Sequence, residues 1–160
     1  MAIQGPIGSG GSVHGHTPSY PIDESWYMDT STTDHKTNEM DKLHLSQPYI
    51  GHDKVHTANG SGMHVTHIGQ SSLPTSTSKE LQLQNVLHVP DVTRNLLHVP
   101  RLTHDNGVFV EFHPFGVFVK DRATRDVLLR GHFNHGLYPL DAPLGFNAFI
   151  NVRVKLSQRH

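Results

Sequence analysis

Short apolar segments separated by polar turns recur along the chain from residue 25 onward. "SWYMD" (25–29) predicts a strand that ends at Asp29. "DKVHTANGSGMHVTHIG" (53–69) holds two alternating segments around "NGSG", which predicts a β-hairpin because Asn and Gly accept positive φ. "LQLQNVLHVP" (81–90) alternates Leu with Gln and predicts a further strand.

The same pattern continues in the second half of the chain. "GVFVEFHPFGVFVKDRATRDVLLRG" (107–131) predicts three strands joined by tight turns, and "GLYPL" and "FNAFINVRV" (146–154) predict two more. "VTRNLLHVPRLTHD" (92–105) is ambiguous, because its apolar residues are spaced like one helical face. Pro100 is expected to limit any helix there to a short turn or two. The regular spacing of short strands indicates an all-β barrel or sandwich.

Composition narrows the class of protein. The formal net charge is −1 and 17% of residues are charged, which disfavours nucleic-acid binding by this chain alone. The absence of cysteine excludes disulfides and thiolate zinc sites. Apolar runs are too short to span a membrane, and the first residues lack the apolar core of a signal peptide. We therefore expect an intracellular, cytoplasmic protein with no membrane partner and no cofactor.

Histidine is unusually frequent, with 15 residues in the chain. His14 and His16 are a pair of the kind that binds metal weakly, although a solvated tail is the stronger interpretation. His64 and His67 would point to opposite faces of a strand and would not converge on one ion. The sequence therefore predicts no metal site.

Several segments together resemble the copia-type retrotransposon polyproteins, which carry a retropepsin-like aspartic protease followed by a pre-integrase segment. "WYMDTSTTDHKTN" resembles the family's strand entering Asp-Thr/Ser-Gly-Ala with its Thr/Ser-x-His-x-Thr tail. "HTANGSGMHVTHIG" is similar to a segment with Asn/Asp-Gly and a strand ending Ile-Gly. "LQNVLHVPDVTRNLLHVPRLTHDNGVFVEF" and "VKDRATRDVLLRGHFNHGLYPL" resemble later elements, and "KLSQRH" resembles the approach to the integrase zinc module. The resemblance covers about residues 25–140.

This resemblance implies a retropepsin-like closed β-barrel with a short helical turn, and a homodimer that acts on polypeptide. We expect a flexible Gly/Ser/Pro-rich leader over 1–22 and a retropepsin-like core over 23–106. Residues 107–140 would form the β-rich C-terminal part of the barrel or the start of the pre-integrase segment, and 141–160 a divergent tail. A hydrophobic content of 35% indicates a small core, which dimerisation would help to stabilise.

The resemblance also gives Asp29 a catalytic role, and aspartic proteolysis needs two carboxylates that share one proton. The chain contains one such motif, so the site would require Asp29 from each of two subunits. Thr30 would make the cross-subunit hydrogen bond of the family. Ser31 stands where the family has Gly, which predicts impaired activity through backbone strain or a blocked pocket. From the local residues alone, a hydrogen-bonded turn that ends a strand is the other interpretation.

Asn59, Gly60 and Gly62 are the candidate substrate-binding residues, in a hairpin that would close over substrate as a flap. An ordinary surface hairpin needs the same residue types. Three functions remain open: an aspartic endopeptidase that processes a polyprotein, a catalytically dead protease fold that serves as an interaction module, and a non-functional transposon remnant.

Overall fold

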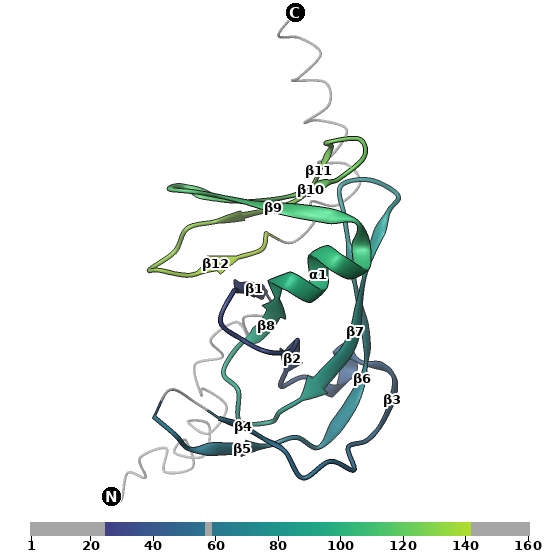
Figure 1. The fold of residues 1–160 in the computed structure, drawn as a ribbon, viewed down its shortest axis with the longest axis vertical. Helices are drawn as coiled ribbons and strands as arrows, with labels where there is room; N and C mark the ends of the chain where they lie inside the picture. Colours follow the sequence, from purple (N-terminus) through teal and green to yellow (C-terminus); the bar gives the residue numbers. More distant parts are fainter. Residues whose placement is uncertain (1–24, 57–58, 142–160) are drawn as a thin grey trace, which may run out of the picture.

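The computed structural model describes residues 25–56 and 59–141, which form three sheets and one α-helix (Figure 1). The expected leader, the pair His14 and His16, and the strand predicted over 146–154 lie outside the described residues. The other strands predicted from the pattern are confirmed. Their bounds are β1 (Trp26–Asp29), β2 (Lys36–Thr37), β3 (His44–Pro48), β4 (Lys54–His56), β5 (Gly62–His64), β6 (His67–Pro74), β7 (Glu80–His88), β8 (Asn95–His98), β9 (Val108–His113), β10 (Gly116–Asp121), β11 (Val127–His132) and β12 (Tyr138–Pro139).

The largest sheet has the order β12-β1-β8-β2-β7-β6-β3, and two smaller sheets contain β11-β10-β9 and β4-β5. β1 pairs with β8 in parallel, and β2 is inserted between β8 and β7. The predicted hairpin is the pair β4–β5, which lies at the opposite end of the molecule from β9–β11 in Figure 1.

The expected closed barrel is not seen in the described part of the chain. The large sheet ends at β12 and β3, and no pairing joins these two strands. β12 has only two residues, and all five residues of β3 are exposed up to Pro48, which has no N–H to donate. Neither edge therefore offers the other a long partner, and the fold is mostly β with one helix.

One apolar core joins the large sheet, the helix and the three-stranded sheet. Alternation along β7 places Leu81 and Leu83 fully inside this core, with Gln82 exposed between them. The three-stranded sheet contributes Val117 and Val119 from its central strand. The complete cluster is Trp26, Met28, Leu43, Leu73, Leu81, Leu83, Val86, Leu97, Leu102, Val108, Val117, Val119, Leu128, Leu129 and Leu140.

A bulge in β7 divides its apolar residues between two cores. The pairing of β7 with β6 shifts by one residue in the middle of the strands, and Asn85 there has φ 55°. Because an extra residue reverses the alternation, Leu81 and Leu83 face the main core, whereas Leu87 and Val89 belong to a second cluster. The second cluster lies between the large sheet and residues of β4 and β5.

The ambiguous segment 92–105 contains both a strand and a helix. β8 ends at His98, and α1 (Val99–Asn106) follows directly. The helix has eight residues, about two turns, as expected, and Pro100 lies in its first turn, where a missing N–H costs nothing. Gly107 has φ 61° and ends the helix in the left-handed conformation that glycine adopts readily. Leu102 anchors α1 in the main core.

Candidate active site

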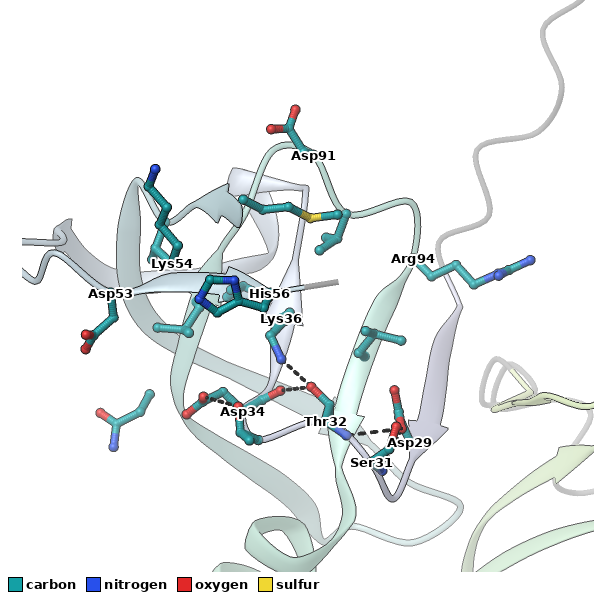
Figure 2. A pocket seen from close by; sticks show the side chains of 18 of the residues that line it. Asp29, Ser31, Thr32, Asp34, Lys36, Asp53, Lys54, His56, Asp91 and Arg94 are labelled. Carbon is teal, nitrogen blue, oxygen red and sulfur yellow. Dashed lines mark hydrogen bonds between the residues drawn. The ribbon is translucent and has the colours of Figure 1, made fainter. Parts of the chain in front are cut away.

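A groove of about 1070 Å³ lies between the loop that follows β1 and the β4–β5 hairpin (Figure 2). Its floor is the face of the large sheet that carries Leu87 and Leu96. The hairpin contributes Val55 and Met63, which are directly opposite each other in its pairing. Asp29 lines the groove at its other side. The groove therefore has apolar residues on its floor and on the hairpin, and the Asp29 carboxylate is part of its lining.

Asp29 stands at the carboxyl end of β1, in register with His98 at the end of the parallel strand β8. Its Oδ1 accepts hydrogen bonds from Ser31 N at 2.8 Å, Ser31 Oγ at 2.6 Å and Thr32 N at 3.2 Å. This is the hydrogen-bonded turn that the local residues predict. All three bonds end on one oxygen, and the other oxygen points away from the loop (Figure 2). The turn thus holds the carboxylate in place without using all its acceptor capacity.

Ser31 contacts Asp29 through its hydroxyl, and its backbone is not strained. It is absent from the non-glycine residues with positive φ, so the strain considered for a side chain at this position does not occur. Its hydroxyl is exposed and donates to the Asp29 carboxylate, a bond that glycine at this position would not make. The predicted impairment therefore has a specific candidate cause.

Lys36 is a buried cation next to this turn, with 4% of its surface exposed. Its Nζ donates to Thr32 Oγ1, and Figure 2 shows the side chain pointing toward the turn. Burial lowers the pKa of Lys36, while the carboxylates of Asp34 and Asp29 raise it. Asp34 itself pairs with Arg101 at 3.4 Å, on the first turn of α1. The groove therefore contains charges of both signs close to Asp29.

His35 connects the same loop to the start of the helix. It is fully buried, and its Nδ1 accepts a hydrogen bond from the backbone N–H of His98 at 3.0 Å. The neutral ring therefore carries its proton on Nε2. Burial is the main cause that lowers the pKa of His35 from 6.5 to about 4, and the electrostatic effects of Arg101 and His98 add to it. The carboxylates of Asp105 and Asp34 oppose this shift with a smaller effect.

Acid is expected to destabilise the protein through His35. Because the pKa is lower in the folded state, the stabilisation is complete above pH 6.5 and is lost as the pH falls toward 4. The loss amounts to about 3 kcal/mol of unfolding free energy. Urea denaturation at pH 7, 5.5 and 4, at one protein concentration, measures it. His35→Gln, which cannot be protonated, should show a smaller loss, and an identical acid dependence in both proteins would contradict the assignment to His35.

The other predicted site residues lie around the groove but are not part of its lining. Thr30 is exposed on the turn after Asp29, and Asn59 and Gly60 lie in the turn between β4 and β5. Gly60 has φ 85°, the conformation that the sequence pattern anticipates for this turn. Gly62 begins β5 and is paired with His56. Their assignment to substrate binding stays a prediction.

Sequence reasoning missed the groove residues Val55, Met63 and Lys36. The alternation in the hairpin was visible, and it signals one apolar face for each strand. Lys36 carries no signal of burial in the sequence, because lysine is almost always exposed. His64 and His67 lie on the separate strands β5 and β6, and no group of three or more potential metal ligands occurs among the described residues. Within the same residues no helix is long and apolar enough to cross a membrane.

Comparison with known proteins gives consistent matches. The family described as "Pol polyprotein, beta-barrel domain" matches residues 26–108. Two Arabidopsis thaliana proteins, "Retrovirus-related Pol polyprotein from transposon RE2" and "Retrovirus-related Pol polyprotein from transposon RE1", are 44% and 43% identical to this chain over 114 residues. The match covers 71% of this chain and 8% of each polyprotein. No solved structure matches the chain.

Proposed function

We propose a function for this chain on the basis that it belongs to the beta-barrel domain family of retrotransposon Pol polyproteins. The chain is an aspartic endopeptidase domain of reduced activity that processes a polyprotein. The observation that carries this proposal is the position of Asp29. The carboxylate is held by its own turn at the end of β1, and it lines a groove whose floor carries Leu87 and Leu96. An extended peptide in that groove would bring a backbone carbonyl next to the carboxylate.

The chemistry requires a second copy of the chain. In an aspartic protease one carboxylate accepts a proton from water while the other donates a hydrogen bond to the scissile carbonyl. One chain supplies one such turn, so a two-fold axis near Asp29 would create the pair. Thr30 and Ser31 are exposed on the same turn, which is what a contact between two such turns needs.

The proposal predicts a dimer that cleaves peptides. Sedimentation equilibrium of the purified chain should give twice the mass of one chain, and a peptide library incubated at pH 4 to 7 should show cleavage by mass spectrometry. A pepstatin-type inhibitor should bind and block the cleavage. A strictly monomeric chain that ignores the inhibitor would contradict the proposal, because a single carboxylate has no partner with which to share the proton.

A second function is favoured by one specific observation, the hydrogen bond from Ser31 Oγ to Asp29 Oδ1. A domain that has lost catalysis keeps the groove and no longer needs a free carboxylate. In that case the chain is an interaction module that holds peptides without cleaving them. Peptide binding that survives without any cleavage, in wild type and in Ser31→Gly alike, would identify this function.

A further inference from the structure

A row of side chains crosses the floor of the groove, and one of them is charged. In the strand pairing, Lys36 of β2 is opposite Leu96 of β8 on one side and Leu87 of β7 on the other. Ile68 of β6 is in turn opposite Leu87. All four residues line the groove, as side chains in register on one face of a sheet do. The floor is therefore apolar except for the ammonium group of Lys36.

This ammonium group has no carboxylate partner among the described residues. The ion pairs there do not include Lys36, and its Nζ donates to the neutral hydroxyl of Thr32. A buried cation is stabilised much more by a charged acceptor than by a hydroxyl, because charge-assisted hydrogen bonds are roughly twice as strong as neutral ones. Lys36 therefore provides an unpaired positive charge at the groove floor.

Two carboxylates of the groove, those of Asp34 and Asp29, raise the pKa of Lys36 without forming an ion pair with it. Asp34 is paired with Arg101 instead. Asp53 and Asp91 are exposed, where solvent weakens their effect on a buried group. Among the other groove cations, Lys54 is exposed on β4 and Arg94 lies over the ring of Tyr27 at 5.2 Å. Lys36 is thus the cation that lies on the apolar floor of the groove.

We propose that the groove selects peptides with a glutamate side chain close to the scissile bond, and that Lys36 determines this specificity. The proposal rests on the endopeptidase function proposed above and names its substrate class. The two methylene groups of glutamate would pack on Leu87 and Leu96, and its carboxylate would accept from Lys36 Nζ. Aspartate is one methylene shorter, and glutamine presents no charge to the ammonium group.

The proposal is tested at pH 6 with two pools of fluorescein-labelled random octapeptides. One central position is fixed in each pool, as Glu in the first pool and as Gln in the second. Fluorescence anisotropy with the Asp29→Asn variant of this chain measures binding without cleavage. We expect the Glu pool to bind roughly tenfold more tightly, as one additional hydrogen bond to a charged group allows. With the unmodified Asp29, the Glu pool should also be cleaved about tenfold faster.

Lys36→Met should abolish the preference for Glu, because methionine keeps an unbranched apolar stem and removes the charge. Lys54→Met is the matched control, since it removes the same charge from an exposed position of the groove and should keep the preference. Lys36→Arg should retain a preference for the Glu pool. Circular dichroism confirms that each variant is folded.

The outcomes separate the inference from the function on which it rests. Equal binding of the Glu and Gln pools by the Asp29→Asn chain overturns the inference, whether or not any peptide is cleaved. This test does not depend on the Lys36→Met variant, so it holds even if that variant fails to fold. Cleavage of both pools at the same rate likewise overturns the glutamate specificity and leaves the endopeptidase function standing. A preference for Glu in binding, with no cleavage of either pool, supports the inference and contradicts the endopeptidase function.

Discussion

Asp29→Asn is expected to reduce peptide cleavage by roughly a hundredfold to ten-thousandfold, the range that general acid–base catalysis by a positioned side chain contributes. Asparagine is nearly isosteric and still offers an oxygen to Ser31 N and Thr32 N, which donate to Asp29 Oδ1 at 2.8 and 3.2 Å. It cannot take a proton from water. The fold should therefore survive while the chemistry is lost. Initial rates on a peptide found by library screening measure the effect.

Asp91→Asn is the matched control for this substitution. Asp91 also lines the groove, and it is exposed after the end of β7. The substitution removes one groove carboxylate without changing the turn that holds Asp29, so cleavage should remain within about threefold of wild type. Sedimentation should give the same mass for both variants. Equal turnover by Asp29→Asn and wild type would dismiss Asp29 as catalytic.

Ser31→Gly is expected to raise cleavage by roughly tenfold to a hundredfold. The hydroxyl of Ser31 donates to Asp29 Oδ1 at 2.6 Å, in addition to the two backbone donors on the same oxygen. A hydrogen bond to a charged group is worth about 1.5–3 kcal/mol, and that stabilisation of the resting carboxylate opposes the proton sharing of the catalytic pair. Glycine removes the hydroxyl and opens space for the partner turn. The ratio of kcat/KM for the two proteins measures the gain.

Ser31→Ala separates the hydroxyl from the bulk of the side chain. Alanine removes the hydrogen bond to Asp29 but keeps the Cβ, and Ser31 does not have the positive φ that would strain it. If the hydroxyl is the cause, Ala and Gly should raise cleavage equally. If crowding between two turns is the cause, only Gly should do so. No gain with either variant would exclude Ser31 as the origin of reduced activity.

Much of the fold was predictable because short-range pattern decides where strands form. Alternating Leu and Gln predicted β7, and "NGSG" predicted the β4–β5 hairpin, since both depend on neighbours in the chain. The closed barrel that we expected is not seen in the described part of the chain, because closure depends on which edges meet and not on short-range pattern. The short helix after β8 was predictable, because Pro100 is compatible with a first turn but not with a helix interior.

The candidate site was only partly predictable for the same reason. Asp29 followed from the apolar strand that precedes it and from the resemblance of its neighbours. The groove beside it was not predictable, because the bulge at Asn85 turns Leu87 to the opposite face from Leu83. A strictly alternating strand would have sent Leu83 and Leu87 to the same core.

The sequence by itself determined the short strands and their turns, including the turn that holds the Asp29 carboxylate. These properties depend on residues that are close along the chain, where backbone preference and alternation operate. Only the tertiary structure decided that His35 is buried beneath the turn and that Lys36 lies among leucines. Each of these depends on strands distant in sequence that pair in one register, and the register sets which face every side chain occupies.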